Sequence, residues 1–171
     1  MSEKSLILSR VSAFTLLAVF AFLFQTCFAT DLSIYGVVPS ILIPCAILVG
    51  MTGGIRTGMI FGVMLGLLCD ATTTRLFGYY ALILLFAGFI AGFLIQSTLW
   101  DTMTAAFVIY IGFYMVMIVV AALVVLLVGS GLSYLGEIAR DLLLQMAYSF
   151  IFIPPVFYLC REIRNRYYKE D

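Results

Sequence analysis

Long stretches without a charged side chain constrain this chain more than any other feature. Residues 11–30, 76–100 and 102–136, for example, are uncharged from end to end. A helix needs about 20 mainly apolar residues to cross the roughly 30 Å hydrocarbon core of a bilayer. Charged residues make up only 11% of the chain, against about 25% in soluble domains. The sequence therefore predicts an all-α membrane protein, with residues 1–171 forming a single integral membrane domain.

Charged and turn-forming residues divide the chain into six predicted transmembrane helices. Arg56, two residues after the pair Gly53 and Gly54, indicates a turn between the second and the third helix. Pro154 and Pro155 are expected to kink the last helix, because proline disrupts helical hydrogen bonding. A segment at about residues 133–140 is expected at the membrane interface. The predicted spans cover about residues 9–30, 37–53, 54–73, 77–99, 104–128 and 141–160.

Six spans place both termini on one side of the membrane, and the basic residues predict which side. Cytoplasmic loops of membrane proteins carry an excess of Lys and Arg. With both termini inside, the inner segments hold seven basic residues and the outer loops hold two, Arg75 and Arg140. We therefore expect a multi-pass membrane protein with both termini cytoplasmic. The expected topology anchors are Arg56, Arg161, Arg164 and Arg166.

The first predicted span has an alternative interpretation as a signal peptide. Lys4 and Arg10 precede an apolar run, and small residues stand near its end, at Cys27 and Ala29. The uncharged run of 20 residues is longer than the roughly 7–15 residues of a usual signal-peptide core. We therefore expect this segment to be a retained helix.

Glycines recur every fourth residue through the middle of the chain. Residues four apart lie nearly above one another on a helix, so this spacing forms a row on one face. In bilayers, rows of small residues allow a second helix to approach closely. The pattern predicts tight helix packing or partner contact at this face. The row comprises Gly50, Gly54, Gly58, Gly62 and Gly66, with Asp70 in the next place.

Asp70 is the most distinctive single side chain, because a carboxylate inside a bilayer costs about 2.5–3.5 kcal/mol at the midplane. Its position near the outer end of the third span reduces that cost. Three interpretations are open from the sequence. The carboxylate caps a helix or pairs with Arg75 or a loop hydroxyl, it binds a partner or ligand, or it couples to protons or ions.

The composition argues against several classes of function. The chain has no histidine, which removes the commonest general base and the commonest zinc ligand. Its four cysteines form no CxxC pair, and we interpret them as small apolar residues. No charged block suggests a nucleic-acid partner. We therefore expect no catalytic residues, no metal and no cofactor.

Several short motifs together resemble a known family. They are the segment from Val38 to Ile43, the glycines at 54, 58 and 62, the segment from Gly66 to Asp70, and Gly78. This pattern is similar to the rod shape-determining protein MreD family, in which a proline precedes the second helix and a glycine-spaced helix ends in an aspartate. Pro154 and the basic tail also resemble that family's end.

The resemblance implies a non-enzymatic component of the bacterial cell-wall elongation complex in the plasma membrane. Its implied partners are an MreC-like membrane protein, and cell-wall synthases and an MreB-like filament, directly or indirectly. It implies a role in cell shape and peptidoglycan synthesis. The residues it implies for packing or partner contact are Gly54, Gly58, Gly62, Gly66, Asp70 and Gly78. An alternative is the substrate-capture subunit of an energy-coupling-factor vitamin transporter, which is also small, apolar and six-helical.

Overall fold

The computed structural model describes residues 3–27, 38–72, 78–97, 102–128 and 132–167, and most of these residues are helical. The predicted all-α class is confirmed for them, since they contain no strand. A short 3-10 turn, η1 (Phe150–Phe152), joins the last two helices. The helices are α1 (Glu3–Cys27), α2 (Leu42–Thr72), α3 (Tyr79–Ser97), α4 (Met103–Val128), α5 (Leu132–Ser149) and α6 (Ile153–Tyr167).

The six predicted spans are not confirmed. Four helical stretches are long and apolar enough to cross a membrane among the described residues, and α1 contributes a shorter apolar stretch, Ser12–Cys27. One reason is that α2 covers both the second and the third predicted span. The finding agrees with a multi-pass membrane protein. The four stretches are Leu42–Ala71, Tyr79–Gln96, Met103–Leu127 and Leu135–Asn165.

The predicted turn near Arg56 corresponds to a sharp break within α2. Gly54 has φ 81° and ψ 176°, which lies outside the helical region. This conformation is essentially restricted to glycine. Helical geometry resumes at once on both sides, so α2 has a first part before Gly54 and a second part after it.

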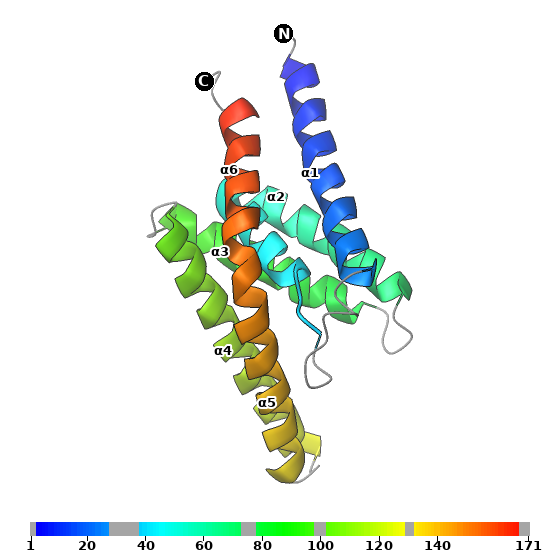
Figure 1. The fold of residues 1–171 in the computed structure, drawn as a ribbon, viewed down its shortest axis with the longest axis vertical. Helices are drawn as coiled ribbons and strands as arrows, with labels where there is room; N and C mark the ends of the chain where they lie inside the picture. Colours follow the sequence, from blue (N-terminus) through cyan, green and yellow to red (C-terminus); the bar gives the residue numbers. More distant parts are fainter. Residues whose placement is uncertain (1–2, 28–37, 73–77, 98–101, 129–131, 168–171) are drawn as a thin grey trace.

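The last predicted span also begins earlier than expected. Residues 133–140, expected at the interface, belong to α5. The chain then continues through η1 into α6, so that a nearly continuous rod replaces the short span 141–160 (Figure 1). Pro154 and Pro155 stand in the first turn of α6, and the irregular turn lies just before them. A proline ring clashes with the carbonyl four residues earlier, and for these two prolines those carbonyls belong to η1.

The helices are arranged with α2 and α3 crossing behind the rod of α5 and α6 (Figure 1). α4 lies beside α5, and α1 packs against α2. The first residue of α1 and the last residue of α6 lie at the same end of the molecule (Figure 1). An even number of membrane crossings gives this arrangement.

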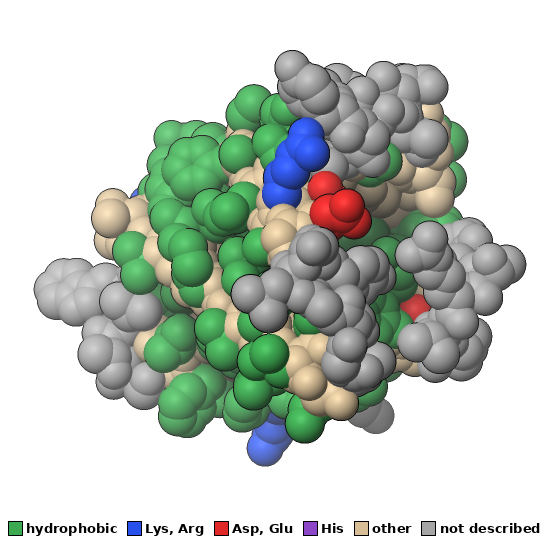
Figure 2. Space-filling view, turned by 90° about the horizontal axis from the view of Figure 1, so that it is seen from below, with side chains coloured by type: hydrophobic (Ala, Val, Ile, Leu, Met, Phe, Trp, Pro, Cys, Tyr) green, Lys and Arg blue, Asp and Glu red, His purple; other side chains and the backbone are tan. Residues whose placement is uncertain are grey.

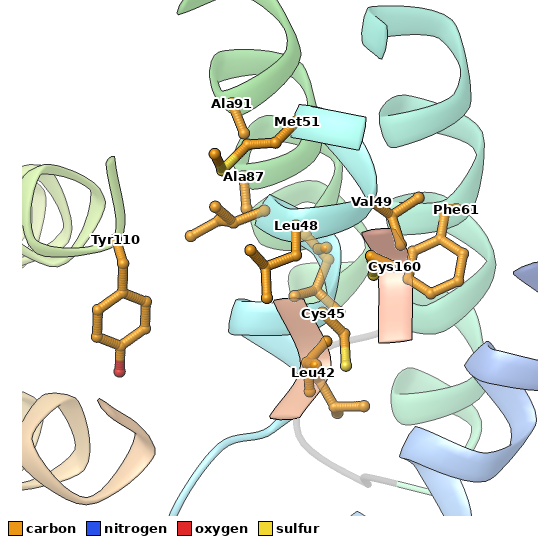
Figure 3. Close-up of a cluster of buried hydrophobic side chains, with 14 of the residues drawn as sticks. Leu42, Cys45, Leu48, Val49, Met51, Phe61, Ala87, Ala91, Tyr110 and Cys160 are labelled. Carbon is orange, nitrogen blue, oxygen red and sulfur yellow. The ribbon is translucent and has the colours of Figure 1, made fainter. Parts of the chain in front are cut away.

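The core surrounds the first part of α2. Every residue from Pro44 to Gly50 is buried, so this segment is enclosed on all sides. Figure 3 shows Phe61 and Cys160 on one side of it and Ala87 and Ala91 on the other. A helix that is apolar all round is suited to such a position.

The outer surface is also apolar. Leu82 and Phe86 of α3, and Val116 and Leu127 of α4, are among many large hydrophobic side chains that are exposed. Seen from below, hydrophobic side chains cover much of the described surface and charged ones are few (Figure 2). Lipid tails are as apolar as leucine, so such faces are compatible with contact to the bilayer.

Candidate functional site

The second part of α2 packs backbone to backbone against α3. Gly58 lies against Gly88, Gly62 lies against Leu84, and Gly66 lies against Ala81. The contacts advance along α2 while they retreat along α3, so the two helices are antiparallel. The predicted glycine row therefore faces another helix of the same chain, along the length of both.

These contacts leave no room for a side chain on the α2 face. A Cβ atom at Gly58 would stand 2.7 Å from the carbonyl oxygen of Gly88, closer than real Cβ atoms come. A Cβ at Gly62 would overlap the backbone carbonyl of Leu84, and one at Gly66 would overlap the Cα of Ala81. In lipid, helix association relies on this kind of close van der Waals contact, because burial from water contributes nothing there.

The break at Gly54 brings the two parts of α2 together at the same place. A Cβ at Gly58 would lie 2.6 Å from the Cα of Gly50, and Gly50 itself lies against Gly88. Three backbone segments thus meet around three glycines. Gly54 differs from the rest of the row, because a Cβ there would meet nothing within 4 Å. Position 54 requires a glycine because of its backbone conformation and not because of close packing.

Asp70 caps the amino end of α3 from the end of the neighbouring helix. Its Oδ2 accepts hydrogen bonds from the backbone N–H of Gly78 at 3.0 Å and of Ala81 at 3.1 Å. Its Oδ1 accepts one from the N–H of Tyr80 at 3.0 Å. The first amide groups of a helix have no partner within the helix. Asp70 supplies that partner for all three.

The geometry explains why a carboxylate is tolerated here. Asp70 is only 3% exposed, but it accepts three hydrogen bonds and lies at the positive end of a helix dipole. Of the three interpretations that the sequence leaves open, this geometry is that of the helix cap. The alternative partners Arg75 and the loop hydroxyls of residues 73–74 lie outside the described residues.

Gly78 occupies the capping position of α3. The N–H of Leu82 donates to the carbonyl of Gly78 at 3.0 Å, which is the first helical hydrogen bond of α3. A capping residue normally provides its own side-chain acceptor. Gly78 has none, and its φ of 96° is one that glycine adopts readily. The acceptor therefore comes from Asp70, eight residues earlier.

The chain before α2 is held by polar side chains that sequence reasoning did not single out. Gln25 of α1 donates to the carbonyl of Pro39 at 2.9 Å and accepts from the N–H of Ile41 at 2.8 Å. Ser149 of α5 accepts from the N–H of Ser40 at 2.8 Å. Non-helical backbone at membrane depth must find partners inside the protein. An isolated glutamine within an apolar span is the signal that could have revealed this contact.

The predicted topology anchors lie away from the glycine contacts. Arg56 follows the break in α2 and is exposed. Arg161 is exposed and Arg164 is half-buried on α6, and Arg166 belongs to the last turn of that helix. Their role as anchors stays a prediction. Among the described residues no group of three His, Cys, Asp or Glu side chains is placed to hold a metal.

The fold and its helix contacts define a multi-pass helical membrane protein with a close glycine-lined pair of helices. Comparison with protein families is in keeping with this class: residues 5–163 match the rod shape-determining protein MreD. The match covers most of the 171 residues, and the chain belongs to the MreD family. No curated protein and no solved structure matches the chain.

Proposed function

We propose that this protein is a non-enzymatic scaffold of the bacterial cell-wall elongation complex. Family membership carries the proposal, because it indicates a role in rod shape determination. In this role the protein contacts an MreC-like membrane protein. Through it the protein links an MreB-like filament to the synthases that build the lateral cell wall.

The α2–α3 pair supports a scaffold by its rigidity. Close backbone contact at Gly58, Gly62 and Gly66 fixes the separation of the helices. The hydrogen bonds of Asp70 fix their register at one end. A scaffold needs surfaces held in constant relative positions. The outer face of α3, with exposed Leu82, Phe86 and Phe93, is thereby held in place for contact with other membrane helices.

The vitamin-capture alternative gains no comparable support. A groove of about 640 Å³ between α1 and α6 is lined almost entirely by apolar side chains and offers little to bind the polar groups of a vitamin. A second, mostly apolar cavity that includes Ser40, Tyr114 and Gln145 has a volume of about 120 Å³. Pockets for drug-sized ligands usually measure about 300–1,000 Å³. This cavity is too small for a vitamin.

Affinity purification in mild detergent tests the proposal. The tagged protein is extracted from the membranes of a rod-shaped bacterium, and bound proteins are identified by mass spectrometry. We expect recovery of an MreC-like protein and of cell-wall synthases. Recovery of an ATPase pair with a coupling subunit would instead support vitamin uptake and contradict the scaffold.

A further inference from the structure

A small cavity lies where α2, α3, α4 and α5 meet. Its walls are formed by the start of α2, the first turns of α3, and the facing sides of α4 and α5, and its volume is about 120 Å³. The Asp70 cap orders one wall, because it binds the backbone of the α3 turn that carries Tyr79 and Tyr80. The rings of these two tyrosines meet edge to face, with centroids 5.5 Å apart.

One polar group at this cavity lacks a partner. The side chain of Tyr114 lines the cavity and is only 1% exposed. Its hydroxyl lies near the side chains of Tyr110 and Ser149, but it makes no hydrogen bond of good geometry within the described part of the chain. The adjacent Tyr110 differs, because its hydroxyl donates to the carbonyl of Met146 at 3.0 Å. A buried hydroxyl without a partner destabilises a fold, so its retention indicates that something else pairs with it.

The other lining groups define the chemistry of an occupant. Gln145 donates through Nε2 to the carbonyl of Val38 at 3.3 Å, which directs its amide group to this region. Ser40 adds a second hydroxyl, and the remaining described walls are aliphatic or tyrosine side chains. No charged side chain is among the described lining residues. A charged occupant would be buried without a counter-charge, at high cost.

We propose that this cavity binds one neutral, ring-sized molecule or lipid end group that carries a hydroxyl. The volume limits the occupant to a group no larger than a single ring, since the cavity of about 120 Å³ is slightly smaller than the cavity of about 150 Å³ that accommodates benzene. The hydroxyl pairs with Tyr114, and the ring or chain packs against Ile83, Leu84 and Met117. This inference does not depend on the role in cell shape.

Fluorine NMR with 4-fluorophenol as the probe tests the proposal on the full-length protein in detergent. Fluorobenzene is the matched probe without a hydroxyl. We expect 4-fluorophenol to bind the wild-type protein about tenfold more tightly than fluorobenzene does, which is the contribution of one hydrogen bond. Partition into micelles is the same for every variant and is subtracted with empty micelles.

Three variants locate the binding. Tyr114→Phe should lose the tenfold preference for 4-fluorophenol, whereas Tyr110→Phe, whose hydroxyl bonds elsewhere, should keep it. Ile83→Phe, which fills the cavity, should weaken both probes. The melting temperature of Tyr114→Phe should equal or exceed that of the wild type, because an unpaired buried hydroxyl is removed.

The results separate the possible occupants. Displacement of 4-fluorophenol by 1-decanol indicates a lipid end group, and resistance to 1-decanol indicates a free small molecule. Equal binding of 4-fluorophenol to the wild type, Tyr114→Phe and Ile83→Phe would overturn the proposal, and so would absence of binding to the wild type.

Discussion

The carboxylate of Asp70 accepts a hydrogen bond from the backbone of Gly78, eight residues later, and so completes the capping position of α3. In many helices the side chains of the capping residue and of the third helical residue each accept a hydrogen bond from a backbone N–H at the helix start. Here a single side chain from the preceding helix, Asp70, accepts all of these hydrogen bonds. The arrangement joins the end of α2 to the start of α3.

Loss of the Asp70 carboxylate should destabilise the protein. Asp70→Ala leaves three partly buried N–H groups without an acceptor, at a cost of about 2 kcal/mol. Asp70→Asn keeps one acceptor oxygen and should cost less. Thermal unfolding in detergent measures both. Equal melting temperatures for the wild type and Asp70→Ala would contradict the capping role.

Alanine at Gly78 should destabilise through backbone strain alone. The φ of Gly78 is 96°, and no atom lies within 4 Å of the position of a new Cβ. The left-handed region costs a residue with a side chain about 1–2 kcal/mol. The matched control is Gly136→Ala in α5, also without close neighbours, which should stabilise by up to about 1 kcal/mol through helix propensity. Thermal shifts of the same sign in both variants would argue against this explanation.

Gln25 should be required to hold the chain before α2. Gln25→Leu leaves the carbonyl of Pro39 and the N–H of Ile41 unpaired, at a cost of about 1–3 kcal/mol. Gln96→Leu, at an exposed position in α3, is the control and should have little effect. Urea or thermal unfolding compares the two. A stability loss confined to Gln96→Leu would contradict the contact.

Both termini should lie in the cytoplasm. If both termini are inside, the inner segments hold seven basic residues and the outer loops hold two, as expected for cytoplasmic inner segments. The two ends of the described chain also lie at the same end of the molecule (Figure 1). A cytoplasmic reporter fused after Asp171 should be active, and a periplasmic reporter at the same site should be silent. The reverse pattern would show that the topology is wrong, as expected if the first segment is cleaved.

Sequence reasoning anticipated features that depend on local spacing. The glycines at every fourth residue predicted that one face of α2 packs closely against another helix. The glycine pair before Arg56 indicated the break in α2. The partner of the glycine face, α3, could not be deduced from the spacing, because any helix with small residues would fit. Capping was among the roles considered for Asp70, but its partners depend on how the chain turns back after residue 72.

Other features depend on contacts between distant parts of the chain. Ser149 meets Ser40 across 109 positions in the sequence. The cavity at Tyr114 depends on four helices. The six predicted spans are not confirmed: α2 continues past the predicted boundary with a break at Gly54, and α5 includes residues 133–140, which were expected at the interface. Hydropathy gives the apolar segments, but only packing decides where a helix breaks.

We expect shape determination to require the close contact of α2 with α3. The most direct measurement is cell shape in a rod-shaped bacterium depleted of its own family member and supplied with variants. Gly62→Leu should insert in the membrane but push α3 away, at a cost of about 1–3 kcal/mol. Gly112→Leu in α4, where a new Cβ meets nothing, is the control. We expect round cells with Gly62→Leu and rods with Gly112→Leu, at equal membrane levels. Normal rods with Gly58→Leu, Gly62→Leu and Gly66→Leu, each tested separately, would contradict the claim.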